Sequence, residues 1–259
     1  MKIFVPIKQI LDPAGITVRR DKERLFVNRE DFIIGPGSKS AIEAALRIKD
    51  TSDAEMIAIT MGQPRADDAL REAMAMGCDR AFLLSDSTFE NADSSVTARI
   101  LAAAVRKLAA ADLIVAGRES GDSGAGQIGP RLAEALDYAL VTDVHALLLR
   151  DGALQASRRW GNGYATLQAA LPAVVTVAPK AFPPRYAHGA RIMNAYREWK
   201  VTIWDAADLD LDATALTPLL TFRGETFPPP LEVGERFEGD PATVARDLVM
   251  TLRLLGLIT

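Results

Sequence analysis

Asp112–Pro130 has the sequence DLIVAGRESGDSGAGQIGP, and this stretch carries the clearest structural signal in the chain. Asp112–Ala116 has the apolar character of a short buried strand. Gly117–Ile128 is glycine-rich and polar, and the apolar spacing of Gln127–Tyr138 is typical of a helix. A strand, a glycine-rich loop and a helix N-terminus together favour anions, because backbone N–H groups and the helix dipole attract negative charge there. The stretch therefore predicts a nucleotide-phosphate site.

The chain before this stretch alternates strands and helices. Apolar runs predict buried strands at Lys2–Ile7, Glu55–Met61 and Arg80–Leu84, with helices at Lys39–Lys49, Arg65–Met76 and from a cap at Asp93 or Ser94 to about Ala110. This alternation predicts an α/β fold with a doubly wound, mostly parallel sheet. Ligands bind beyond the carboxyl ends of strands in such sheets, so the turns at Pro6–Pro13, Met61–Pro64, Gly117–Gly129 and Gly35–Ser38 are expected to converge. Ile16–Asn28 is predicted to form a hairpin on the sheet edge.

The chain after residue 140 predicts an antiparallel extension followed by an arm. Short strands are expected at Val141–Arg150, Ala153–Arg159 and Tyr164–Ala170, then a buried strand at Leu171–Val177. We assign residues 1–204 to a nucleotide-binding α/β domain and residues 205–259 to a C-terminal arm. The arm ends in an amphipathic helix at Thr243–Leu255, whose apolar stripe needs a surface to lie on. That surface is either its own domain or a partner chain.

Composition excludes several classes of function. The formal net charge of −4 argues against broad binding to nucleic acids or anionic membranes. One cysteine, Cys78, and two histidines, His145 and His188, exclude a disulfide framework and a Cys/His metal centre. Without a signal peptide or a membrane-spanning run, the chain is expected to be soluble and cytoplasmic. No nucleophile has a partnered base, so we expect neither catalytic residues nor a metal.

Two glycine motifs leave the kind of nucleotide site open. Gly124–Gly129 matches G-x-G-x-x-G, and Asp143 follows nineteen residues after Gly124. A Rossmann NAD site is disfavoured, because the motif follows the fourth strand and begins well beyond its end. Gly35–Ser40 lacks P-loop spacing, so helix capping and close backbone approach to a ligand are its expected roles. A stand-alone adenine-nucleotide sensor module and a Rossmann-type dehydrogenase remain alternatives.

An ordered set of segments resembles the beta subunit of electron transfer flavoprotein. The segments are FVPIKQILDP (4–13), AMAMGCDRAFLL (73–84), ADLIVAGRESGD (111–122), LPAVVTV (171–177), PRYA (184–187), IMNA (192–195) and EGDPATVARDLVMTLRLLGLI (238–258). The resemblance implies a fold of the adenine nucleotide alpha-hydrolase-like type and a bacterial heterodimer with an alpha subunit that holds FAD. It also implies a carrier without enzymatic activity of its own. The carrier would pass electrons from flavin-dependent dehydrogenases of fatty acid or amino acid oxidation to a quinone oxidoreductase, with the arm packed on the alpha subunit.

The resemblance also assigns residues by position. The cofactor-binding residues that it implies are Pro6, Gly35, Pro36, Gly37, Ser38, Met61, Gly117, Arg118, Glu119, Ser120, Gly121, Asp122, Ser123, Gly124, Ala125, Gly126, Gln127 and Ile128. The partner-recognition residues that it implies are Arg185, Tyr186, Gly189, Ile192 and Met193. The bound nucleotide would be AMP or, in the electron-bifurcating branch, a second FAD. The loop keeps Gln127 of the AMP type and Asp122, Gln127, Gly129 and Pro130 of the bifurcating type, so the resemblance does not choose between them. Gly189 replaces a leucine that anchors acyl-CoA dehydrogenases, which implies a different dehydrogenase partner.

Overall fold

The computed structural model describes all residues except 151, 222, 225, 230–233 and 259. Its strands are β1 (Lys2–Pro6), β2 (Gln9–Leu11), β3 (Ile16–Arg19), β4 (Arg24–Val27), β5 (Phe32–Ile34), β6 (Glu55–Met61), β7 (Arg80–Leu84), β8 (Leu113–Gly117), β9 (Ala139–Arg150), β10 (Ala153–Trp160), β11 (Gly163–Ala170), β12 (Ala173–Val177) and β13 (Val201–Trp204). Its α-helices are α1 (Pro36–Lys49), α2 (Asp67–Met76), α3 (Ser94–Lys107), α4 (Ile128–Leu136), α5 (Gly189–Arg197) and α6 (Pro241–Leu254).

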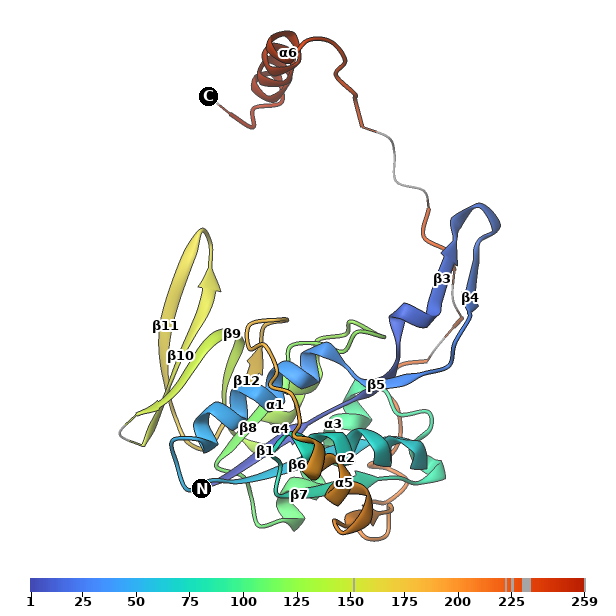
Figure 1. Cartoon of the computed structure of the whole chain (residues 1–259), viewed down its shortest axis with the longest axis vertical. Helices are drawn as coiled ribbons and strands as arrows, with labels where there is room; N and C mark the ends of the chain where they lie inside the picture. The colour runs from blue at the N-terminus through green and yellow to red at the C-terminus, as the bar shows by residue number, and fades with distance from the viewer. Residues whose placement is uncertain (151, 222, 225, 230–233, 259) are drawn as a thin grey trace. The chain divides into compact units, whose positions relative to one another are not determined.

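A nine-stranded sheet forms the centre of the molecule (Figure 1). Its order is β11-β10-β9-β12-β8-β1-β6-β7-β13, and all neighbours from β9 to β13 are parallel. β10 and β11 continue the sheet in antiparallel pairing. The predicted mostly parallel sheet with an antiparallel extension is therefore confirmed. The chain leaves β1 toward β6 and later returns to β8 on the other side of β1, so the strand order reverses between β1 and β8.

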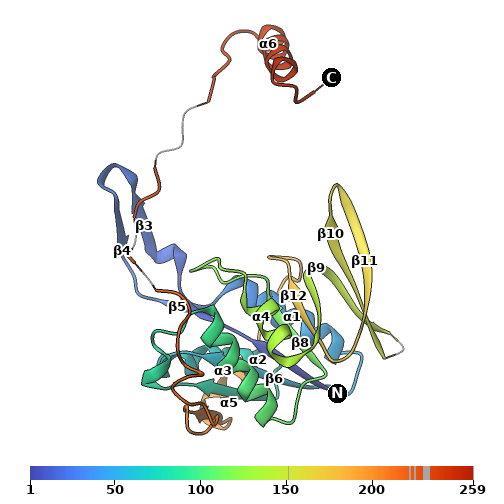
Figure 2. The same cartoon turned by 180° about the vertical axis from the view of Figure 1, so that it is seen from behind.

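Helices cover both faces of this sheet, as Figures 1 and 2 show. α1 and α2 pack on one face and α3 and α4 on the other, while α5 packs on α2. Alternation along β1 supplies both layers, because successive side chains of a strand point to opposite faces. Ile3 and Val5 enter the core beneath α1 and α2, and Phe4 enters the core beneath α3. The fold is thus doubly wound.

Several helices differ from their predicted limits for local reasons. α1 begins at Pro36 rather than Lys39, because proline is favoured at the first helical position and Gly35 precedes it as the N-cap. α3 ends at Lys107, short of the predicted Ala110, and Ala110 has a positive φ of 60° that a right-handed helix cannot include. Element identity was therefore predicted better than element ends.

The predicted hairpin at Ile16–Asn28 forms, but its predicted place on the sheet edge is wrong. β3 and β4 make a separate two-stranded sheet that projects from the rest of this part of the chain in both views (Figures 1 and 2). β13 and β11 occupy the two edges of the large sheet instead. The β3–β4 ribbon, residues 16–27, therefore has no neighbouring strand on either side in the described chain.

The chain divides into two compact units, Met1–Phe222 and Arg223–Thr259. Residues 205–222, which the sequence led us to assign to the arm, belong to the first unit because Leu209 is buried and Leu216 packs on the same core as α3. The second unit contains α6, whose N-cap is Asp240. α6 buries none of its residues within this unit. None of the helices in the described chain is long and apolar enough to cross a membrane.

Candidate functional site

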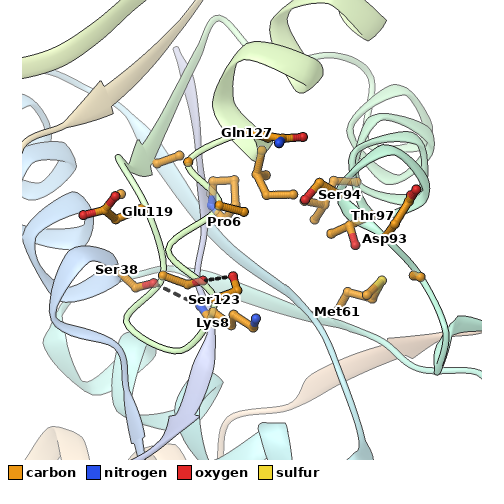
Figure 3. Close-up of a pocket in the computed structure, with 18 of the residues that line it drawn as sticks. Pro6, Lys8, Ser38, Met61, Asp93, Ser94, Thr97, Glu119, Ser123 and Gln127 are labelled. Carbon is orange, nitrogen blue, oxygen red and sulfur yellow. Dashed lines mark hydrogen bonds between the residues drawn. The ribbon is translucent and has the colours of Figure 1, made fainter. Parts of the chain in front are cut away.

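A cleft of about 1160 Å³ opens at the carboxyl ends of β1, β6 and β8 (Figure 3). The last residues of these strands, Pro6, Met61 and Gly117, all line it. The cleft therefore lies at the reversal of strand order, where the doubly wound topology predicts a ligand. The loop after β8, the N-terminus of α3 and the segment 218–221 form its other walls.

The structure brings most of the sequence-predicted site residues to this cleft. Those that line it are Pro6, Ser38, Met61, Gly117, Arg118, Glu119, Ser120, Ser123, Ala125, Gly126, Gln127 and Ile128. Those that lie outside its lining are Gly35, Pro36, Gly37, Gly121, Asp122 and Gly124. The second group belongs to the same two turns as the first, so its members act on the walls of the cleft rather than on its contents.

Gly37 and Gly117 show how such a residue acts on the cleft wall. A Cβ on Gly117 would lie 2.7 Å from the carbonyl carbon of Gly37, and a Cβ on Gly37 would lie 2.8 Å from the carbonyl oxygen of Glu119. Real Cβ atoms do not approach other atoms so closely, so both positions require glycine. The turn before α1 and the loop after β8 therefore pack backbone against backbone.

Internal hydrogen bonds order the loop after β8. Gly124 N–H donates to the carbonyl of Ser120 at 2.9 Å, and the hydroxyls of Ser120 and Ser123 lie 3.0 Å apart. Gly124 and Gly126 have φ angles of 59° and 64°, the left-handed region that favours glycine. The two glycines of the G-x-G pattern therefore allow the backbone conformation that this loop adopts.

The cations beside the cleft are already neutralised. The Lys8 ammonium lies 2.6 Å from the Asp122 carboxylate, and Arg118 pairs with Glu119 at 2.7 Å and with Asp143 at 3.3 Å. Burial opposes ionisation of Asp122, but the hydrogen bonds from Lys8, Ser120 and Ser123 N–H and the charge of Lys8 together outweigh it and hold the pKa of that carboxyl below its usual range. Asp143 does not line the cleft, so it does not occupy the ribose-binding place of a Rossmann site. An anion in the cleft would meet N–H and hydroxyl groups rather than free cations.

The N-termini of α3 and α4 both face the cleft, and a negatively charged side chain caps only the first of them. α3 is capped by Asp93, whose Oδ1 accepts from the N–H groups of Ser95 and Val96 at 2.9 Å. In the described chain, no side chain caps α4, which begins after Gln127. The α4 terminus therefore keeps its positive dipole end for an anion, whereas a carboxylate already satisfies α3.

The sequence predictions missed two walls of the cleft. Glu90, Asn91, Ala92, Asp93, Ser94, Thr97 and Leu101 form the wall at α3, and Pro218, Leu220 and Thr221 form a second wall. The rule that ligands lie beyond the carboxyl ends of strands, applied to the strand at Arg80–Leu84, would have included the first wall. Asp93 holds the second wall, because its Oδ2 accepts from Leu219 N–H at 2.8 Å and from Leu220 N–H at 3.0 Å.

The predicted partner-recognition residues lie elsewhere, in and before α5. Tyr186 is fully exposed, and Ile192 and Met193 are half exposed on α5. Gly189 is the first residue of this helix and is also exposed. Arg185 is exposed as well, but its guanidinium bonds the nearly buried Glu43 and also Asp50 on α1. These residues do not line the cleft, so the molecule presents two separate candidate surfaces.

The chain is similar in sequence to known proteins over most of its length. The family model described as "Electron transfer flavoprotein domain" matches residues 25–209. The chain is 35% identical over 98% of both chains to "Caffeyl-CoA reductase-Etf complex subunit CarD" of Acetobacterium woodii. It is 34% identical to "Electron transfer flavoprotein subunit beta" of Thermoanaerobacterium thermosaccharolyticum, over 97% of this chain and 98% of that one. It is 33% identical to "Acryloyl-CoA reductase electron transfer subunit gamma" of Anaerotignum propionicum, over 96% and 97%.

Proposed function

The chain belongs to the electron transfer flavoprotein family, in which it is a beta subunit that serves as an electron-transfer carrier, and on this premise we propose that its cleft holds a second FAD. The family implies flavin or nucleotide binding. Its relatives match nearly the full chain, which does not favour a stand-alone sensor module or a Rossmann-type dehydrogenase. The fold then corresponds to the adenine nucleotide alpha-hydrolase-like type that the resemblance implies.

The two helix N-termini support one orientation of the nucleotide. Its phosphates lie at the uncapped N-terminus of α4 and against the loop 117–128, because N–H groups and the helix dipole favour negative charge there. The Asp93 carboxylate makes the α3 side unfavourable for a phosphate. An uncharged ring therefore lies on the α3 side, where Met61 and Leu101 offer apolar surface and Ser94 and Thr97 offer hydroxyls.

The volume of the cleft is the observation that favours FAD over AMP as its ligand. Its volume of about 1160 Å³ lies above the range of roughly 300–1,000 Å³ that is usual for ligand pockets. FAD has more than twice as many non-hydrogen atoms as AMP, so AMP alone would leave much of the cleft to water. The small side chains of Ser38, Ser123 and Ala125 keep this volume open.

A bound flavin would supply one- and two-electron redox chemistry, and the chain's own residues hold and shield it. The Lys8–Asp122 and Arg118–Glu119 pairs fix the loop without placing a free cation at the phosphates. The segment 218–221, tied to Asp93, excludes water from one side.

We also propose which surfaces of the chain bind the donor dehydrogenase and the alpha subunit. A flavin-dependent dehydrogenase docks on the surface that carries Tyr186, Ile192 and Met193, and exposed aromatic and long apolar side chains support this role. The alpha subunit holds the first FAD and receives α6, whose Leu248, Met250 and Leu254 are exposed. Electrons then leave toward a quinone oxidoreductase or another acceptor, in fatty acid or amino acid oxidation.

The test is the identity of the nucleotides in the purified complex with an alpha subunit. The complex is denatured, the protein is removed, and the released nucleotides are separated by chromatography and compared with FAD and AMP standards. We expect two FAD for each heterodimer and no AMP. One FAD and one AMP would overturn the choice of FAD, and a complex without any nucleotide beyond the alpha subunit's FAD would overturn the nucleotide site.

A further inference from the structure

The β3–β4 ribbon has one face made entirely of aliphatic side chains. Residues directly opposite each other in an antiparallel pair share a face, and successive residues alternate. The register pairs Ile16 with Val27 and Val18 with Leu25, so these four side chains lie together on one face. Val18, Leu25 and Val27 are 52%, 58% and 49% exposed. A contiguous aliphatic surface therefore stands in solvent.

The base of the ribbon is firmly fixed to the first unit. Gly15 accepts backbone hydrogen bonds from Asn28 and Arg29, and a Cβ on Gly15 would lie 2.3 Å from the carbonyl oxygen of Arg29. The Asn28 amide also donates to the Thr17 hydroxyl at 2.7 Å. The strands are therefore held in register where they leave the fold. The ribbon follows β1 and β2 in the chain, so it leaves from the segment whose Ile7 and Lys8 line the cleft.

Beyond its base, the ribbon lacks the packing that such a structure needs. An isolated two-stranded hairpin is marginally stable in water and usually requires a further strand or a packed face. Every described residue of β4 is exposed, and β3 is exposed except for Ile16. Large exposed apolar patches on otherwise soluble proteins mark interaction sites. The aliphatic face is therefore expected to be covered in the working molecule.

The charged residues on the opposite face and at the tip of the ribbon indicate that the covering partner is negatively charged there. Arg19 and Arg24 lie directly across the ribbon from each other, an arrangement that is destabilising for like charges. In the described chain neither of them takes part in an ion pair. Arg20 and Lys22 add two further cations at the tip, against Asp21 and Glu23. A partner that offers carboxylates between the two guanidinium groups would remove this repulsion.

We propose that the β3–β4 ribbon inserts into an apolar groove bordered by carboxylates on the alpha subunit. The inference rests on the proposed function, since it assigns a surface to that partner. An all-aliphatic face fits a permanent interface, because obligate interfaces are more apolar than transient ones. The surface that carries Tyr186, Ile192 and Met193 is left for the transient partner, the donor dehydrogenase. A second copy of this chain offers a poorer match, because it would bring the same unpaired arginines to the contact.

The test uses the full-length chain co-expressed with a tagged alpha subunit. Val18→Lys with Leu25→Glu changes the aliphatic face while keeping opposite charges across the strands, which preserves their pairing. Gln155→Lys with Gln168→Glu is the matched control, because it changes a directly opposed pair in the β10–β11 extension. Circular dichroism and thermal unfolding confirm that each variant is folded.

We expect the ribbon variant to bind the alpha subunit at least about 100-fold more weakly, as for the loss of interface hot spots, and the control to bind like the wild type. Arg19→Glu with Arg24→Glu should also weaken binding. Hydrogen exchange of the unaltered complex should show protection of residues 16–27 on binding. A ribbon variant that binds like the wild type, or a ribbon that stays unprotected in the complex, would overturn the inference. Protection of the ribbon only in homodimers of this chain would also overturn the inference. A wild-type chain that binds no alpha subunit would instead overturn the proposed function.

Discussion

Gly37 and Gly117 explain at the scale of single residues why a glycine can matter to a site without touching its ligand. Their backbones meet so closely that any Cβ would push the turn before α1 away from the loop after β8. Gly129 acts in the same way, because a Cβ there would lie 2.2 Å from Cγ2 of Thr176 and would push α4 away from β12. The glycines of this region therefore set the distance between the walls of the cleft.

Asp93 is the residue that joins two walls, and its ionisation predicts a pH dependence. Burial opposes ionisation, but the N–H groups of Val96, Leu219, Leu220 and Ser95 outweigh it and hold the pKa of Asp93 below its usual range. A carboxyl with a lowered folded-state pKa stabilises the fold above its unfolded pKa of about 3.9, and this stabilisation is lost as the pH falls through the folded pKa.

Asp93→Asn should therefore lower the free energy of unfolding by about 1 kcal/mol at pH 7, because the amide nitrogen cannot accept from Leu219 and Leu220. The difference between wild type and variant should shrink as the pH falls below about 4. Urea unfolding at a series of pH values measures both quantities. A difference that stays constant down to pH 2 would show that the charge of Asp93 does not contribute.

At the scale of elements, the buried strands were the most predictable part of the fold. Glu55–Met61 and Arg80–Leu84 were predicted to the residue, because continuous apolar runs identify strands covered on both faces. The place of the ribbon at residues 16–27 could not be predicted, since its alternating pattern describes a hairpin but not its neighbours. The wall at 218–221 had no local signal either, because it is held by Asp93 from a distant part of the chain.

Arg185 is one of the side chains that join α1 to the segment before α5. Its guanidinium makes two hydrogen bonds to the Glu43 carboxylate, at 2.9 and 3.2 Å, and it also bonds Asp50. Sequence resemblance assigned Arg185 to partner recognition together with Tyr186. The geometry instead favours different roles for the two residues: Arg185 positions the segment before α5, and Tyr186 contacts the partner.

Substitution of Arg185 should lower the stability of the protein, whereas substitution of Tyr186 should weaken its use by the donor dehydrogenase. Arg185→Lys should lower the free energy of unfolding by about 2 kcal/mol, because an ammonium cannot reproduce the fork that satisfies the nearly buried Glu43. Tyr186→Ala should leave stability within about 0.5 kcal/mol, because the side chain is fully exposed, and should raise the KM for the donor dehydrogenase. Thermal unfolding and steady-state reduction of the complex measure the two effects. Equal destabilisation by both substitutions would contradict these different roles.

At the scale of the whole molecule, each of the two units, considered alone, exposes an apolar surface among its described residues. The first unit exposes the aliphatic face of the β3–β4 ribbon, and the second unit exposes the apolar residues of α6. Both features fit a chain that completes its structure in a heterodimer. The fold class was predictable because strand–helix alternation lies within each segment, whereas the limits of the two units depend on contacts such as that of Leu216 with the α3 core.

The proposed second flavin in the cleft of this subunit, in addition to the flavin of the alpha subunit, can be counted directly. The most direct measurement is the ratio of FAD to protein in the purified heterodimer, compared with that of a variant whose cleft is filled. Thr97 lines the cleft from α3 (Figure 3), so Thr97→Trp would occupy the space of the ligand, and Thr97→Ser is the matched control. We expect two FAD for each wild-type and Thr97→Ser heterodimer and one for Thr97→Trp. One FAD in the wild type, or two in an intact Thr97→Trp heterodimer, would contradict the proposal.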